Sequence, residues 1–275
     1  MYSTKNLADG PVMVPDRRPG QRLGIDAGFT VLGPLALVRD GVDYAPTTPK
    51  LLQLLALLVL RPGKMVHADA IAQELWADKP PRTMRTTMHT YVYHLRRCLD
   101  EHGLGSLLET KAPGYVFRID PAQVDVFRFG QLQQEGQELL REEQYAAAVE
   151  RFRSALDVWT GPPLANVPSG PMLLPYTVEL LEQRRTTMHM LFEAEIASGH
   201  HRELIGELRA VTAGNPLDEA LHGQLMRVLG RSGRRSDAML VYRTLRKRLS
   251  EELGVEPCAD LQILHHDLIS EGDHS

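Results

Sequence analysis

The apolar residues between positions 80 and 99 recur at the spacing of an α-helix. These residues are Met84, Met88, Val92, Leu95 and Leu99, at spacings of four, four, three and four positions. A stripe of this kind is what a helix buries against a core. The pattern predicts a helix over residues 80–99, with Asp78 as its N-cap and Pro80 or Pro81 in its first turn, where a missing N–H costs nothing.

The opposite side of this predicted helix is basic and rich in hydrogen-bonding groups. Five Lys or Arg residues and no acid occur between Lys79 and Arg97. A helix with one buried side and one cationic side has the properties of an element that reads the major groove of DNA. Most amphipathic helices that carry arginines are solvated surface helices, so this helix alone leaves both interpretations open.

The flanking segments supply the other parts of a winged helix-turn-helix. Residues 29–39 alternate between apolar and other positions, and Asp40-Gly41 supplies a hairpin turn before residues 42–44, which predicts a small antiparallel sheet. Further helices are predicted at residues 50–60 and 68–76, and short strands at residues 66–67, 107–110 and 115–119. The last two strands enclose residues 111–114, which would form the wing.

From Asp125 onward the pattern is helical throughout. Helices are predicted at residues 125–142, 144–159 and 175–198, with a linker rich in Pro and Gly at 164–175. An internal echo follows at 34 residues, in which Gly199, Leu204, Leu208 and Val211 match Gly233, Ala238, Tyr242 and Leu245. This is the tetratricopeptide period, and stacked helix pairs of that kind leave a concave surface for a peptide or a partner helix. The alternative is a helical support for the winged helix.

Together these patterns predict an α+β N-terminal winged helix-turn-helix domain followed by an all-α tetratricopeptide-like helical domain. The predicted boundaries are a flexible tail at residues 1–22, the winged-helix domain at 23–121 and the helical domain at 122–275. The charge supports this division. The whole chain carries −4, but residues 21–121 have twelve Lys or Arg against ten acids, whereas residues 122–275 have sixteen against twenty-three.

Several classes of protein are not expected. The longest apolar run, residues 51–60, is too short to span a membrane, and no signal peptide is evident, so we expect a cytoplasmic protein. Cys98 and Cys258 lack metal-ligand spacing and are predicted to be helix-packing thiols. The chain contains no phosphate-binding loop, HExxH or GxSxG motif, and the adjacent histidines at 200–201 and 265–266 would diverge on a helix. We therefore predict no enzyme, no metal and no cofactor.

Two stretches carry a family resemblance. The sequence LETKAPGYVFRI after YVYHLRRCL resembles the C-terminal part of OmpR-type winged-helix domains. With FTVLGPLALVRDG near the start and QELWADKPPRTMRTTMHTYVYHLRRCL in the middle, the chain is similar over about residues 27–270 to the SARP family of actinomycete pathway regulators. The resemblance implies a bacterial transcriptional activator domain after the winged helix. It also implies activation of an antibiotic biosynthetic gene cluster, binding as two protomers to promoter direct repeats near −35, and contact with RNA polymerase through the sigma subunit.

The predicted DNA-binding residues come from the polar helix face and from the wing. They are Arg82, Arg85, Thr86, His89, Thr90, Tyr93, His94, Arg96, Arg97, Lys111 and Tyr115. Arg82, Arg96, Arg97 and Lys111 are expected to supply salt-dependent affinity for phosphates, and Arg85 is the first candidate for a guanine contact. The resemblance places Lys111 at the minor groove and Tyr115 at a phosphate. Many OmpR-type domains have two arginines where this chain has Tyr93 and His94, so the bases that are read stay open.

Two alternatives remain at this stage. A helical adaptor whose winged helix binds protein would show no salt-sensitive preference for a DNA sequence. A repressor would bind DNA and lower transcription.

Overall fold

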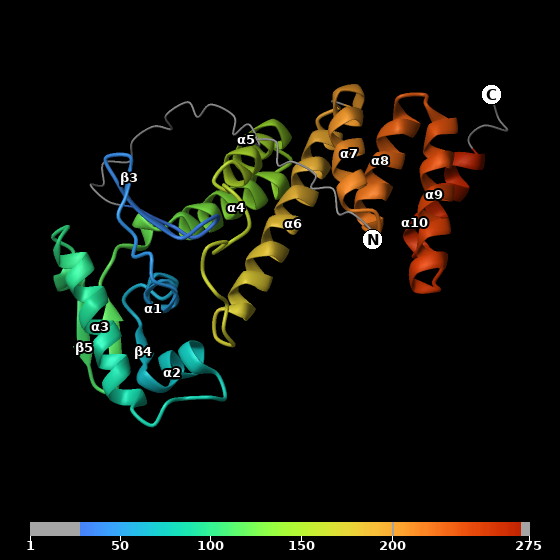
Figure 1. Ribbon diagram of the computed structural model, residues 1–275. Helices are drawn as coiled ribbons and strands as arrows, with labels where there is room; N and C mark the ends of the chain where they lie inside the picture. Colours follow the sequence, from blue (N-terminus) through green and yellow to red (C-terminus); the bar gives the residue numbers. More distant parts are fainter. Residues whose placement is uncertain (1–27, 200, 271–275) are drawn as a thin grey trace, which may run out of the picture.

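A computed structural model of the chain describes residues 28–199 and 201–270 (Figure 1). A winged-helix region of small sheets and helices is followed by a helical domain, which confirms the predicted fold class. The predicted flexible tail at residues 1–22 lies outside the described residues.

The first sheet is a three-stranded antiparallel meander. Its strands are β1 (Gly28–Thr30), β2 (Ala36–Arg39) and β3 (Val42–Asp43), in the order β1-β2-β3. Asp40 and Gly41, with φ of 51° and 79°, form the predicted turn between β2 and β3.

Residues 29–39 do not form one continuous strand, contrary to the alternation that suggested it. Residues 31–35 leave the sheet and pair with the helical domain instead. The N–H of Thr160 donates to the carbonyl of Leu32 (2.8 Å), and the N–H of Leu164 donates to that of Val31 (3.0 Å). The apolar residues of this stretch are buried by that domain, so their alternation reported burial and not strand pairing.

Three helices and a strand form the centre of the winged helix. They are α1 (Pro49–Val59), β4 (Met65–His67), α2 (Ala68–Trp76) and α3 (Met84–Asp100). Helix α1 is buried along most of its length, as its apolar run predicted. In α3 the predicted stripe faces the core, with Met88, Val92, Leu95 and Leu99 all buried.

Helix α3 begins later than predicted. Its N-cap is Thr83 and not Asp78, and the two prolines precede the helix. A residue before proline is disfavoured in the α region, so consecutive prolines extend the chain here instead of starting the helix. Arg82 therefore lies in the turn before α3 and not on the helix.

The wing is the hairpin of β5 (Leu108–Lys111) and β6 (Gly114–Phe117), and it follows the 3₁₀ turn η1 (Gly105–Leu107). Strand β6 also pairs with β4, so the second sheet has the order β4-β6-β5. Gly114 is required at this crossing, because a Cβ there would lie 2.1 Å from the carbonyl oxygen of Val66.

The helical domain follows a short 3₁₀ turn, η2 (Pro121–Gln123). Its helices are α4 (Asp125–Arg141), α5 (Tyr145–Leu156), α6 (Leu174–Ala197), α7 (His201–Gly214), α8 (Glu219–Arg231), α9 (Arg235–Leu253) and α10 (Ala259–Ser270). The 34-residue echo falls on α7 and α9. Gly199 and Gly233 precede these helices with φ of 86° and 74°, and Leu208 and Tyr242 occupy matching buried positions. The tetratricopeptide likeness itself stays a prediction.

The hydrophobic cores do not follow the predicted domain boundary. The largest core continues from the winged helix into the helical domain, where it includes Phe129, Trp159, Leu173 and Leu180. A second core, formed by α6 to α10, surrounds Phe192 and is separate from the first. Helix α6 is the long diagonal helix that connects the two regions (Figure 1).

Two carboxylates, one buried and one half-buried, bind backbone across the boundary between winged helix and helical domain. Glu74 of α2, 2% exposed, accepts hydrogen bonds from the N–H groups of Gly170 (2.6 Å), Met172 (2.8 Å) and Leu173 (3.0 Å), just before α6 begins. Asp125, at the start of α4, accepts from the N–H groups of Val31 and Leu32 at 2.9–3.0 Å. We call these two carboxylates and the backbone they bind the joint.

Burial raises the pKa of Asp125 from 3.8 to about 6, although the backbone hydrogen bonds from Leu32 and Val31 oppose this rise.

The thiol prediction is wrong for one cysteine. Cys98 is half-buried in α3, but Cys258 is exposed in the segment that leads into α10. Among the described residues no helix is both long and apolar enough to cross a membrane. The same residues contain no cluster of three or more His, Cys, Asp or Glu side chains that could hold a metal ion.

Candidate DNA-binding surface

The polar side of α3 is open to solvent. Exposed there, or in the turn that precedes the helix, are Arg82, Arg85, Thr86, His89, Thr90, Tyr93, His94 and Arg97. Tyr93 is 59% exposed, and its ring lies edge-on to that of His94 with 5.6 Å between the centroids. We call these residues the α3 face. Helices α7 to α10 lie at the far end of α6, well away from α3 (Figure 1), so the acidic half of the chain leaves this face uncovered.

The cations of this surface differ in whether they have partners. Within the described chain, Arg82, Arg85 and Lys111 make no ion pair or side-chain hydrogen bond, and all three are exposed. Arg97 lies 3.9 Å from Glu101 on the same helix, and both side chains are more than 60% exposed. An exposed pair of this kind contributes little to stability, so Arg97 is available to a phosphate.

Arg96 is already engaged inside the domain. Its guanidinium donates to the carbonyl of Leu108 from Nε (3.2 Å) and Nη2 (2.9 Å), and Nη2 also donates to the hydroxyl of Thr110 (3.0 Å). These bonds fix the first strand of the wing against α3. The predicted phosphate contact of Arg96 stays a prediction, and the contacts seen here give this residue a structural task as well.

Tyr115 is also held by a neighbour. Its side chain is 3% exposed, and its hydroxyl lies 3.1 Å from Nδ1 of His89. Burial raises the pKa of Tyr115, and the positive charge of Arg96 opposes this effect. The hydroxyl of Thr90 donates to the carbonyl of Thr86 (3.0 Å) and keeps its acceptor capacity. Roles for Tyr115 at a phosphate and for Thr90 at a base stay predictions.

A cleft of about 410 Å³ separates the first turns of α3 from the wing and the start of α2. Arg85, Met88, His89 and Tyr115 line it, so the fold brings predicted residues from the helix and the wing to one site. His67 and Thr110 line the cleft too, although no sequence pattern singled them out. Their place follows from the pairing of β4 with β6 and of β5 with β6, which no local pattern specifies.

This fold and this surface define a DNA-binding transcriptional regulator of the winged-helix class. Two family models match successive parts of the chain. Residues 44–117 match the family "Transcriptional regulatory protein, C terminal", and residues 124–269 match the "Bacterial transcriptional activator domain". The chain belongs to the SARP family, whose members are transcriptional regulators and not enzymes.

Individual relatives are similar along most of the chain. Regulatory protein DnrI of Streptomyces peucetius is 36% identical over 249 residues, which cover 88% of this chain and 91% of that protein. Regulatory protein AfsR of Streptomyces coelicolor is 34% identical over 95% of this chain, which corresponds to 26% of its own length. The solved structure of Mycobacterium tuberculosis EmbR in complex with a low-affinity phosphopeptide has a TM-score of 0.84 at 31% identity, over 90% of this chain and 65% of that one.

Proposed function

We propose that this protein activates transcription of a secondary-metabolite biosynthetic gene cluster, as the SARP resemblance implies. It binds direct repeats near the −35 region of the promoter as two protomers side by side. The helical domain contacts RNA polymerase, with the sigma subunit as the expected partner.

The observation that carries the proposal is the combination of an uncovered cationic α3 face with a wing held beside it. Arg82, Arg85 and Lys111 have no partner among the described residues and lie where α3, the preceding turn and the wing meet solvent. Unpaired cations release counterions from phosphates when they bind DNA, and an α-helix fits the major groove.

The proposed roles divide between affinity and sequence reading. Arg82, Arg97 and Lys111 bind phosphates and supply affinity that falls with salt. Arg85 pairs with a guanine, and the remaining exposed side chains of the α3 face contact other base edges. Arg96 holds the wing through Leu108 and Thr110. Lys111 of that wing binds at the adjacent minor groove, as the SARP resemblance implies.

The test is a mobility-shift titration on the upstream regions of the neighbouring genes at several salt concentrations, followed by footprinting. We expect a protected pair of direct repeats and an affinity that falls steeply with salt. Run-off transcription with purified polymerase then gives the sign of the effect, and activation is expected. Lys247→Ala on α9, whose ammonium is exposed and remote from α3, is the matched control and should bind as the wild type does. Binding without sequence preference would contradict the proposal.

A further inference from the structure

Two faces of α6 differ in how far other elements cover them. One face packs along the winged helix and α5 through residues such as Leu180 and Leu191. The opposite face is buried only in the second half of the helix, where Phe192 joins the core of α7 to α10. In the first half the same face carries Leu174, Val178 and Leu181, which are 55%, 60% and 49% exposed. At spacings of four and three residues they form one row, which we call the free stripe.

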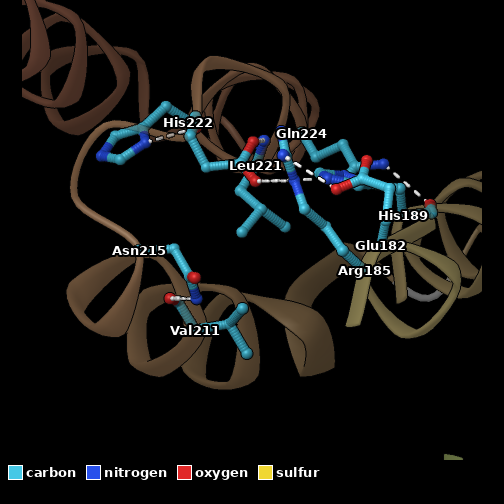
Figure 2. Close-up of polar contacts among 9 residues, drawn as sticks. Glu182, Arg185, His189, Val211, Asn215, Leu221, His222 and Gln224 are labelled. Carbon is cyan, nitrogen blue, oxygen red and sulfur yellow. Dashed lines mark hydrogen bonds and ion pairs between the residues drawn. The ribbon is translucent and has the colours of Figure 1, made fainter. Parts of the chain in front are cut away.

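The free stripe leads directly into a cleft. Continuing along the same face, Arg185 and His189 follow Leu181 by one and two turns, and both line a cleft of about 560 Å³ between α6, α8 and α10. Figure 2 shows Arg185 and His189 of α6 facing Leu221 and Gln224 of α8. From Leu174 to His189 the helix rises about 22 Å. Stripe and cleft together therefore form one elongated surface, which is longer than a compact small molecule would need.

Polar groups of this cleft lack hydrogen-bond partners in the described chain. Gln224 is 7% exposed, and its Nε2 donates to the carbonyl of His189 (2.9 Å), but its Oε1 is buried without a donor. Both ring nitrogens of His189 are also buried without a hydrogen bond. Nε2 lies 3.3 Å from Oδ2 of Asp218 outside hydrogen-bond geometry, and Asp218 already accepts from Arg185 (2.9 Å).

Buried polar groups in proteins are nearly always hydrogen-bonded, so these unpaired atoms leave the ground beneath the cleft polar and incompletely satisfied.

The charge of the cleft favours a basic occupant. Its lining contains four carboxylates, Glu193, Asp218, Glu219 and Asp260, against the two guanidinium groups of Arg185 and Arg227. Arg185 and Asp218 neutralise each other through their ion pair. The remaining excess is negative and would attract Lys or Arg side chains.

We propose that the free stripe and this cleft bind an elongated, basic segment of an RNA polymerase subunit. Apolar side chains of the segment cover Val178 and Leu181, and its basic side chains face the carboxylates of the cleft. A second copy of this chain is a poorer occupant, because its own basic surface, the α3 face, is engaged by DNA. The inference rests on the proposed function and adds to it the site of polymerase contact.

Photocrosslinking in a reconstituted promoter complex tests this site. Val178 is replaced by p-benzoylphenylalanine, and the full-length protein is mixed with its promoter fragment and purified polymerase. Leu240 on α9, 61% exposed and outside this groove, is replaced in the control. We expect a crosslink from position 178 to a basic segment of one polymerase subunit and at least a fivefold weaker one from position 240. A crosslink to a second copy, or none above the control, would overturn the inference.

Activation measurements give an independent arm. The double substitution Val178→Ser and Leu181→Ser changes exposed side chains, so the fold and the footprint should persist while run-off transcription falls at least fivefold. Leu240→Ser, the matched control, should change neither activation nor the crosslink from position 178. Full activation by the double variant would contradict the proposal. If the wild-type protein itself gave no footprint, the proposed function would be refuted instead. The two failures are therefore distinguishable.

Discussion

The joint and the α3 face both depend on charged side chains, but they use them in opposite ways. At the joint, Glu74 is buried, Asp125 is half-buried, and their oxygens accept hydrogen bonds from backbone N–H groups of the other region. On the α3 face and the wing, Arg82, Arg85 and Lys111 are exposed and have no partner in the described chain. Carboxyl groups of the first kind bond the two regions to each other, whereas the cations of the second kind are available to a ligand. Substitutions in the two regions should therefore separate stability from DNA binding.

The largest effect is expected at Glu74. Glu74→Ala leaves three N–H groups before α6 buried without an acceptor, and each orphaned group costs about 1–3 kcal/mol. We expect the free energy of unfolding to fall by about 3–5 kcal/mol in urea titrations followed by circular dichroism. Glu109→Ala removes an exposed carboxylate paired with Arg118 and should cost less than about 1 kcal/mol. A similar small loss for Glu74→Ala would show that the joint does not stabilise the fold.

Asp125 should make stability depend on pH. Its pKa is raised from 3.8 to about 6, so the folded state holds a proton that the unfolded state has already lost. The resulting stabilisation is complete below pH 3.8 and disappears as pH rises through 6. Two pKa units correspond to about 3 kcal/mol. The difference in unfolding free energy between wild type and Asp125→Asn, measured from pH 4 to pH 7, should fall by up to this amount. A difference that does not change with pH would contradict the raised pKa of Asp125.

The next effect belongs to the α3 face. Arg85→Ala should relax the preference at one base pair by about 1–3 kcal/mol, because a bidentate contact to guanine supplies discrimination of that size. The exposed side chain has no partner in the described chain, so the unfolding free energy should stay within about 0.5 kcal/mol of wild type. Competition titrations with single-base variants of the footprinted site measure the first quantity. Equal losses on every sequence would make Arg85 a phosphate contact instead.

Much of the fold could be predicted because local patterns specified it. The stripe of α3, the turn at Asp40-Gly41 and the helices of both regions follow from spacing and turn chemistry. The start of α3 was missed because capping residues and prolines allow more than one register. The role of residues 31–35 was missed because their partner is a loop more than a hundred residues away.

The sequence predicted which side of α3 carries the candidate DNA-binding residues, but not which of these residues have partners inside the domain. Periodicity identified which residues of α3 are exposed, and the structure confirms that exposure. It could not show that Arg96 and Tyr115 are bound within the domain, since Leu108 and His89 reach them only after the wing has folded against α3. No local pattern marks Glu74 as buried, because the loop that buries it lies about a hundred residues further on.

Arg96 should affect both stability and DNA binding, with a smaller loss of unfolding free energy than Glu74. Arg96→Ala removes three hydrogen bonds to the first wing strand, and we expect a loss of about 1–2 kcal/mol in unfolding free energy. Because the wing carries Lys111, DNA affinity should fall as well. The double variant Arg96→Ala with Lys111→Ala tests this coupling, and its loss of affinity should be smaller than the sum of the single losses. Strictly additive losses of affinity would show that Arg96 does not act on DNA binding through the wing.

The smallest change is expected from Arg97, and it is also the most specific test of a phosphate contact. Arg97→Ala should weaken binding to all sequences alike and lower the slope of log affinity against log salt by about one. Its pair with Glu101 is exposed at 3.9 Å, so the unfolding free energy should change by less than about 0.5 kcal/mol. Glu101→Ala is the matched control, because it removes the same ion pair but leaves the cation. Since Glu101→Ala frees Arg97, it should keep the full slope of log affinity against log salt. An unchanged slope in Arg97→Ala would show that Arg97 does not contact a phosphate.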